Sequence, residues 1–182
     1  MQRVVTGHTE NGKSVFASTG EPPRIVNFVE PPIPEFSEPW LTELWGTDDI
    51  PTVPLDGGDP TVTMRSFVPA PGGTRFRITR IAPQQKIKQS LEKGINLEER
   101  LKSTPDLAGM FEPEHPGMHT TNTVDYGIVI SGEVSLELDD GAEIHLKPGD
   151  CVVQNGTRHA WRNRGSDDCV MAFIMVGAKR NK

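Results

Sequence analysis

The fold of this chain is decided by residues 117–163, which read GMHTTNTVDYGIVISGEVSLELDDGAEIHLKPGDCVVQNGTRHAWRN. Within this stretch, apolar residues alternate with polar ones in several short runs, a pattern typical of half-buried strands. Turn signals separate the runs at Gly132 and at residues 139–141, 148–150 and 155–156. Short strands at such regular spacing predict an all-β fold, an antiparallel barrel or sandwich.

The first of these strands is expected to have two chemically different faces, because side chains two residues apart share one face of a strand. The polar face holds His119, Thr121, Thr123 and Asp125. The opposite face holds Tyr126, Ile128 and Ile130. Near the end of the stretch, one face of a second strand holds His159, Trp161 and Asn163. The pattern therefore predicts that polar and apolar side chains point to opposite sides of the sheet.

The stretch resembles the double motif of the cupin family. In the first motif, Gly117 and Gly132 stand at the two glycine positions, and His119 matches the first histidine. Asp125 stands where the family usually has glutamate. Thr121 is a departure, since it occupies the position of the second histidine. One of the four usual metal ligands is therefore missing.

The second motif of the resemblance begins at residues 148–150, Pro-Gly-Asp, and ends with His159 and Asn163. Together the two motifs imply a single jelly-roll barrel, the double-stranded β-helix of the cupins. We expect this barrel to carry an N-terminal strand-rich arm and one short helical insertion.

The resemblance implies a divalent metal ion inside the barrel, with His119, Asp125 and His159 as ligands. Two histidines and one carboxylate with open positions favour Fe(II), while Zn(II), Mn(II) and Ni(II) are alternatives because ligand type selects weakly among them. Thr121 is able to reach a metal-bound water and is a catalytic candidate with Asp125. In the competing interpretation the lost ligand means a lost metal, and both histidines are hydrogen-bonded residues of a polar pocket.

The implied function is a metal-dependent enzyme acting on a small organic molecule, with Thr123 and Trp161 lining the substrate pocket. Iron favours an oxidoreductase of the dioxygenase type. A redox-inert ion favours a lyase or isomerase that decarboxylates or dehydrates its substrate, with Asp125 as ligand or base. A non-catalytic small-ligand-binding barrel is the third alternative.

Composition narrows the choice of partners. The chain has 182 residues, enough for one domain, and its 19 Lys and Arg against 25 Asp and Glu argue against nucleic acid as a partner. The local exception is formed by Arg158, Arg162 and Arg164, which we interpret as a solvated barrel rim, or alternatively as a lip that steers anions.

The two cysteines and the hydropathy pattern bear on the compartment. Cys151 and Cys169 lie in apolar strand patterns and are expected to be free buried thiols in a reducing compartment. The N-terminus lacks an apolar core of the signal-peptide kind, and no stretch is long enough for a membrane span. We therefore expect a cytoplasmic protein with no membrane partner.

Residues 1–60 are expected to form a separate N-terminal region. Asn11-Gly12 is a strong turn signal between two β-prone runs and predicts a hairpin. The proline-rich residues 20–39 predict an extended arm that packs on the barrel or on a second subunit. The resemblance makes a homodimer the expected assembly. Residues 40–45 are expected to form a single helical turn.

The barrel is expected to span residues 61–176. Residues 61–68 and 74–81 have strand patterns, and apolar residues at near-helical spacing predict a helix or broken helix over residues 84–101. The loop at residues 103–116 leads directly into the first motif, so it is a candidate lid.

Three smaller predictions concern the ends of the barrel region. His115 is expected to be a loop residue rather than a ligand. Residues 169–176 are apolar on both faces and predict a fully buried closing strand. Residues 177–182 are polar and are expected to be a frayed tail.

Overall fold

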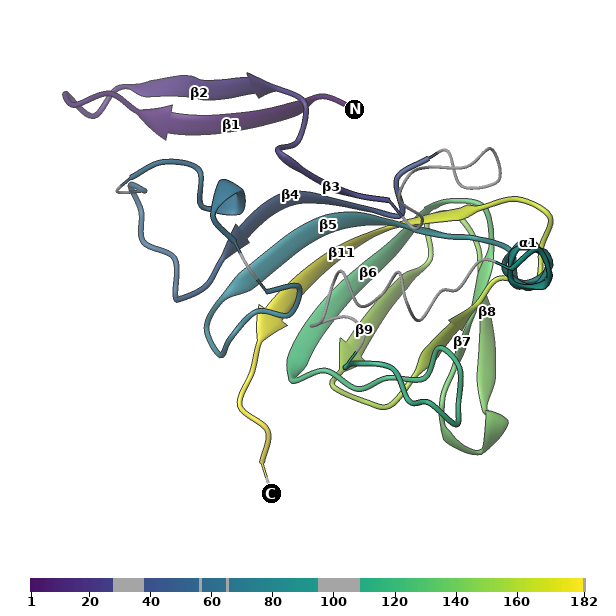
Figure 1. Ribbon diagram of the computed structural model, residues 1–182. Coiled ribbons are helices and arrows are strands. Elements are labelled where there is room, and N and C mark those ends of the chain that lie inside the picture. Colours follow the sequence, from purple (N-terminus) through teal and green to yellow (C-terminus); the bar gives the residue numbers. More distant parts are fainter. Residues whose placement is uncertain (28–37, 56, 65, 95–108, 182) are drawn as a thin grey trace.

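The computed structural model of the chain is shown in Figure 1. It describes residues 1–27, 38–55, 57–64, 66–94 and 109–181. Its larger sheet has six antiparallel strands in the order β3-β4-β5-β11-β6-β9, and a smaller sheet has three in the order β10-β7-β8. The strands of the larger sheet are β3 (Arg24–Val26), β4 (Leu41–Thr47), β5 (Thr74–Ile81), β6 (Thr123–Ser131), β9 (Cys151–Asn155) and β11 (Cys169–Gly177). Those of the smaller sheet are β7 (Val134–Glu137), β8 (Glu143–Leu146) and β10 (Ala160–Arg162).

The two sheets enclose the main apolar core. Its buried residues come from both sheets, and they are Val129, Val134, Leu136, Leu146, Cys169 and Met171. Trp161 and Phe173 are partly buried and pack against this cluster. Because side chains alternate along a strand, each sheet gives one face to this core. The predicted all-β barrel is confirmed, with α1 (Gln84–Glu92) as its short helical insertion.

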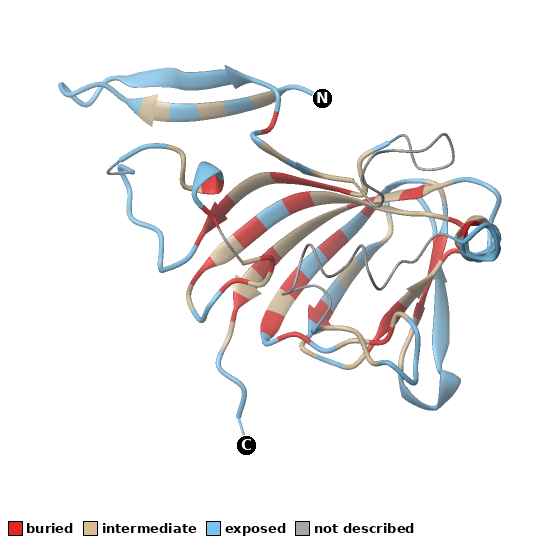
Figure 2. Ribbon diagram, in the orientation of Figure 1, coloured by how far each residue is buried: buried red, intermediate tan, exposed pale blue. Residues whose placement is uncertain are grey.

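The predicted alternation of faces is found along β6. Thr123, Asp125 and Val129 are buried, while Tyr126 and Ile128 are exposed. Figure 2 shows this alternation as changing colours along the strands of the larger sheet.

The strand of the first motif starts later than expected. His119 and Thr121 precede β6, which begins at Thr123. The reason is that β9 and β11 pair with β6 only from Val124 and Thr123 onward, so the residues before them have no continuous ladder. His119 forms instead isolated bridges to Phe111 and His159.

Two other sequence predictions are wrong. Residues 40–45 do not form a helical turn, because β4 pairs with β3 on one side and β5 on the other and tertiary pairing overrides local preference. The described part of residues 61–68 holds no strand, and a 3-10 helix at Pro60–Val62 occupies its start. Asp59 caps this helix by accepting a hydrogen bond from the Thr61 amide at 2.9 Å.

Several further sequence predictions concern the peripheral parts of the chain. Cys169 is fully buried, but Cys151 is exposed, because it sits opposite Ile128 on the outer face of the larger sheet. The helix predicted over 84–101 is present as α1, and its later part falls in residues 95–108, outside the described residues. In the described part of the chain, no helix is long and apolar enough to cross a membrane.

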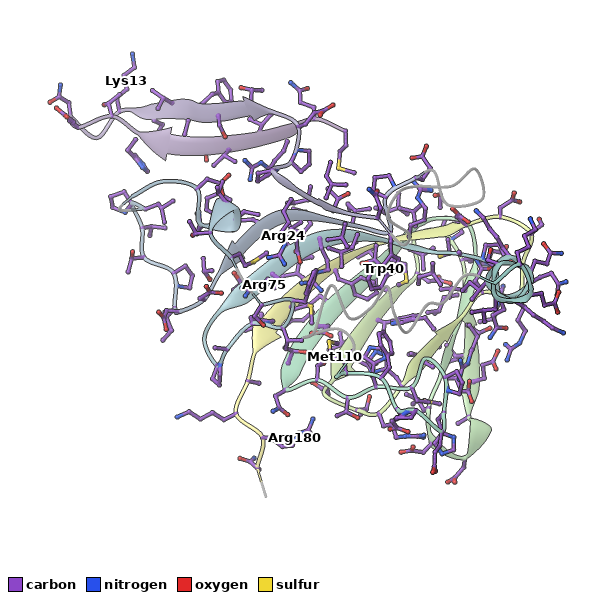
Figure 3. All side chains as sticks on the ribbon, viewed as in Figure 1. Lys13, Arg24, Trp40, Arg75, Met110 and Arg180 are labelled. Carbon is purple, nitrogen blue, oxygen red and sulfur yellow. The ribbon has the colours of Figure 1, made fainter. Side chains whose placement is uncertain are left out.

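The C-terminal tail is anchored rather than frayed. Arg180 lies on this tail beyond β11 (Figure 3). Its guanidinium donates hydrogen bonds to Asn122 Oδ1 at 2.6 Å, to the Thr121 carbonyl at 3.0 Å and to the Gly156 carbonyl at 2.9 Å. The tail therefore holds the segment that leads from the first motif into β6.

The N-terminal residues form a hairpin. It consists of β1 (Arg3–His8) and β2 (Ser14–Gly20), joined by a turn at residues 9–13. Figure 1 shows the hairpin standing apart from the barrel, above β3. Its described polar links to the barrel region come from Arg3, which contacts Asp59 and donates to the Leu44 carbonyl at 3.1 Å.

Candidate active site

Two histidines from opposite ends of the double motif lie side by side. His119 and His159 exchange two backbone hydrogen bonds of 3.0 Å each. Their ring centroids are 4.2 Å apart, with an angle of 50° between the ring planes. This isolated bridge, which lies outside the named strands, thus brings together the two histidines that the sequence placed in separate motifs.

Both imidazoles are held in the same tautomer. Nδ1 of His119 lies 3.0 Å from the Gly117 carbonyl, and Nδ1 of His159 lies 3.0 Å from the Thr157 carbonyl. A carbonyl oxygen only accepts, so each Nδ1 donates its proton and each Nε2 keeps its lone pair. Neutral imidazoles held by a backbone carbonyl in this way are suited to bind a metal ion through Nε2.

Burial keeps both rings uncharged. It lowers the pKa of His119, and it lowers the pKa of His159 to about 4, with a further contribution from the neighbouring His119. The cause is that a charged imidazolium loses its hydration when it is buried. At neutral pH the site therefore presents two neutral imidazoles.

Asp125 lies on the inner face of β6 and is 6% exposed. Burial raises the pKa of this carboxyl, while a hydrogen bond from Thr123 and the charge of Arg77 act in the opposite direction. Within the described residues, Asp125 Oδ1 has no hydrogen-bond partner. A buried carboxylate oxygen without a partner is costly, and such groups are found where a ligand or a reaction uses them.

Asp125 does not join the histidines as the expected third ligand. Among the residues the structure describes, no group of three His, Cys, Asp or Glu side chains is placed to hold a metal ion. The register explains this, since Asp125 sits within the β6 ladder opposite Gln154 and Met175, whereas His119 and His159 pair before that ladder begins. The structure therefore brings together two of the three predicted ligands, His119 and His159.

Thr121 and Thr123 lie between His119 and Asp125 in the sequence. The hydroxyls of Thr121 and Thr123 are 2.7 Å apart, and both residues are buried. Thr121 also lines a hollow of about 540 Å³ with Met110 and Arg75 among its other walls. Of the two predicted catalytic residues, Thr121 is the one that lines this hollow. Thr123 forms hydrogen bonds with both Thr121 and Asp125.

Aromatic rings support the histidines on both sides. The Phe111 and His119 centroids are 5.2 Å apart, and those of His159 and Trp161 are 5.9 Å apart, both in edge-on arrangements. Trp161 in turn contacts Phe173 at 5.5 Å. Trp161, predicted to line a substrate pocket, therefore packs between the core and His159. Phe111 was not singled out from the sequence, because it precedes the motif.

A buried ion pair lies on the same inner face of the larger sheet. Arg77 Nη2 is 2.7 Å from Glu43 Oε1, and the two side chains are 7% and 0% exposed. Arg77 sits on β5, two strands from Asp125 on β6, and its charge acts on that carboxyl. Arg77 alternates with the apolar Phe76 and Ile78 along β5, and nothing in the sequence showed that its side of the strand is buried.

The arginine cluster forms a rim held by ion pairs. Arg158 donates to both oxygens of Glu112 at 2.7 Å and to Asp139 at 2.8 Å. Arg162 and Arg164 are paired with Glu137 and Glu143, respectively. Each guanidinium already has a carboxylate partner, so the structure agrees with a solvated rim and offers no free lip for anions.

A second hollow lies at this rim. It has a volume of about 700 Å³, and its walls include Glu112, Met118 and Arg158. His115 lines it as well, from the loop that precedes the first motif. The candidate lid at residues 103–116 is described only from residue 109.

Comparison with known proteins identifies the matched region. A family model for the cupin domain matches residues 109–176. The phomopsin biosynthesis cluster protein C' of Diaporthe leptostromiformis is 55% identical over 63 residues, which are 34% of this chain and 33% of that protein. The cupin-domain-containing oxidoreductase fogC of Aspergillus ruber is 37% identical over 62 residues, covering 32% of this chain and 30% of that protein. The match thus spans about a third of the length of these relatives.

Among solved structures, a cupin-2 conserved barrel domain protein from Salinispora arenicola is similar, with a TM-score of 0.35 and 19% identity over 62% of this chain and 68% of that one. The matched residues of the family model include both histidines of the site and all of β6 to β10. Residues 109–176 of this chain are therefore similar to the cupin domain.

Proposed function

We propose that this cupin is an oxidoreductase that acts on a small organic molecule at the histidine pair His119 and His159, with Asp125 on the inner face of β6 as a separate catalytic group. One observation carries the proposal. Two neutral imidazoles with unused Nε2 lone pairs lie side by side, and the inner face of β6 carries a buried carboxylate oxygen that has no hydrogen-bond partner among the described residues. The relatives named as cupin-domain-containing oxidoreductases support the same reaction class.

The Nε2 atoms of His119 and His159 are the groups that would hold a divalent metal ion, with Fe(II) favoured. When bound, such an ion supplies redox and Lewis-acid chemistry, and iron would make a dioxygenase-type reaction accessible. The carbonyls of Gly117 and Thr157 fix the two rings in the tautomer that leaves Nε2 available.

The other site residues have roles that their contacts suggest. Burial raises the pKa of the Asp125 carboxyl above its ordinary value, so this group is suited to accept a proton from a substrate. The Thr121 and Thr123 hydroxyls, 2.7 Å apart, are suited to orient a polar substrate group beside it. The substrate would be a small polar intermediate of a biosynthetic cluster, the setting named for the phomopsin relative.

A redox-inert reaction is the second candidate. It is favoured by the isolation of Asp125, because a carboxylate kept apart from the two histidines is free to act as a base instead of a ligand. With a redox-inert ion on the histidines, this arrangement would serve decarboxylation, dehydration or isomerisation.

Metal analysis tests the proposal. The protein is purified without added metal, and its metal content is compared with that of His159→Ala and His145→Ala. His145 is the matched control, because it is an exposed histidine paired with Glu133 on the smaller sheet. Iron that is lost only in His159→Ala supports the oxidoreductase, and oxygen uptake with candidate substrates then follows. Zinc, manganese or nickel lost in the same way favours the second candidate. Metal absent from all three proteins and not taken up on reconstitution overturns the metal-dependent function.

A further inference from the structure

The turn that leads into His159 is held by a buried side chain, Gln154. This residue is 4% exposed and lies near the end of β9, directly opposite Asp125 in the ladder with β6. Asn155 and Gly156 then turn the chain toward His159, and Gly156 has a φ of +59°, which favours glycine. A buried amide side chain needs hydrogen-bond partners, so its partners decide what it does for this turn.

The Gln154 amide binds Thr157 at two points. Its Nε2 atom donates to the Thr157 carbonyl at 3.3 Å and also to the Thr157 hydroxyl. A side-chain amide nitrogen has two N–H groups, so this one residue accounts for both of them. A carbonyl oxygen only accepts, and the amide must therefore present its nitrogen to the turn rather than its oxygen. Gln154 thus fixes the position of the Thr157 carbonyl.

The same carbonyl holds the His159 ring. His159 Nδ1 lies 3.0 Å from the Thr157 oxygen. A carbonyl oxygen has two lone pairs, so it accepts from His159 Nδ1 and from Gln154 Nε2 together. The rings of His119 and Trp161, with centroids 4.2 and 5.9 Å from that of His159, limit its tilt. Ring contacts do not determine which nitrogen carries the proton, whereas the hydrogen bond to Thr157 does.

A second side chain binds the neighbouring carbonyl of this turn. Arg180 donates to the Gly156 carbonyl at 2.9 Å. This bond steadies the backbone between β9 and His159. Gln154 differs from Arg180 because it acts on the carbonyl that accepts the hydrogen bond of the His159 ring.

We propose that Gln154 is a positioning residue that sets the orientation and the tautomer of His159 relative to Asp125. Its backbone is fixed in the ladder opposite Asp125, and its side chain fixes the acceptor of His159 Nδ1. The register between β6 and β9 is thereby passed to the histidine pair through one side chain. This inference rests on the proposed function, in which His159 Nε2 binds a metal ion, and it adds the residue that keeps this atom available.

NMR of the imidazole nitrogens in the metal-free protein tests the assignment, because the protonated and unprotonated nitrogens of a neutral ring have different resonances. In the unmodified protein, His119 and His159 are both expected to carry the proton on Nδ1. Gln154→Met keeps an unbranched side chain of similar length but removes both N–H donors. It is expected to give His159 a mixture of tautomers in which Nε2 also carries the proton. His119 is the internal control, because the Gly117 carbonyl holds its Nδ1.

Titration with Zn(II) alone provides a second readout. If His159 no longer keeps Nε2 free, the affinity for Zn(II) should fall by roughly 10- to 100-fold in Gln154→Met. Thr157→Val removes the hydroxyl contact and keeps the carbonyl, so a smaller loss in the same direction is expected. Asn155→Ala changes the exposed neighbour on β9 and is the matched control. It is expected to behave as the unmodified protein in both measurements.

The two readouts separate this inference from the proposed function. A His159 tautomer that stays the same in Gln154→Met, or an Nε2 proton on His159 in the unmodified protein, overturns the positioning role. A change of tautomer at both histidines also overturns it, because that result indicates a general loosening of the site. Thr157→Val repeats the tautomer test with a smaller change, in case Gln154→Met does not fold. A protein that binds no metal while its His159 tautomer responds to Gln154→Met supports the positioning role and contradicts the metal-dependent function.

Discussion

Arg77 and Glu43 form an ion pair inside the barrel, with Nη2 and Oε1 2.7 Å apart and the Glu43 side chain fully buried. Arg77 also contacts the Phe67 carbonyl, so this guanidinium joins β4, β5 and the segment between them. The pair lies on the inner face that also carries Asp125, and it helps to set the electrostatic environment of that carboxyl.

Removing one member of this pair should be costly. Glu43→Gln and Arg77→Met each leave a buried charge without its partner, and we expect each to lower the free energy of unfolding by about 3–5 kcal/mol. The double variant Glu43→Gln/Arg77→Met should lose less than the sum of the two. Urea denaturation of all three proteins measures this. Additive losses would show that the two side chains act independently.

Replacing Asp125 should separate activity from stability. Asp125→Asn removes a buried charge whose Oδ1 lacks a partner among the described residues, so we expect the unfolding free energy to stay the same or to rise by about 1 kcal/mol. Turnover of an identified substrate should fall by roughly 100-fold or more. Thermal unfolding and turnover of the same preparation provide the comparison. A large loss of stability would assign Asp125 a structural role.

Stability should depend on pH through His159. Its pKa is about 4 in the folded protein and 6.5 is the ordinary value, so the unfolded chain binds the proton more tightly. The stabilising contribution is complete above pH 6.5 and is lost as the pH falls through 4. The metal-free protein should lose about 3 kcal/mol over this window, and His159→Gln should flatten the curve. An unchanged curve in His159→Gln would contradict the assignment.

The C-terminal anchor should contribute to the site as well as to the fold. Arg180→Ala removes three hydrogen bonds to Asn122, Thr121 and Gly156, and we expect a loss of about 1–2 kcal/mol in unfolding free energy. Lys179→Ala changes a neighbouring residue on the same tail and serves as the control. Hydrogen exchange at the Thr121 and Thr123 amides should increase in Arg180→Ala alone. Equal exchange in both variants would show that the tail does not hold this segment.

Local sequence patterns predicted the fold correctly where the pairing between distant strands agrees with the local preference. Alternation assigned the faces of β6 correctly, since Asp125 is buried and Tyr126 exposed. The resemblance to the double motif also implied that His119 and His159 come together, and an isolated bridge outside the named strands does pair them. These features follow from the two-residue period of a strand and from turn residues, both of which are local.

Features that depend on contacts between residues far apart in the sequence could not be predicted from local patterns. Trp45 lies in a strand because β4 pairs with β3 on one side and with β5 on the other. No local sequence signal predicted this pairing. The placement of Asp125 relative to the histidines depends on the register between β6 and β9. The two-residue spacing from His119 to Asp125 along the chain does not reveal this register. The anchoring of the tail depends on Arg180 meeting residues nearly sixty positions earlier in the chain, such as Asn122.

The ion pair between Arg158 and Glu112 forms part of the wall of the hollow at the rim, so entry into this hollow is expected to depend on ionic strength. These side chains are 28% and 34% exposed, so dissolved salt reaches them and weakens their attraction. A neutral molecule crossing this rim would then associate faster in concentrated salt than in dilute buffer. That trend is opposite to the one produced when a protein attracts an oppositely charged molecule, and it would identify the rim as a barrier held by charge.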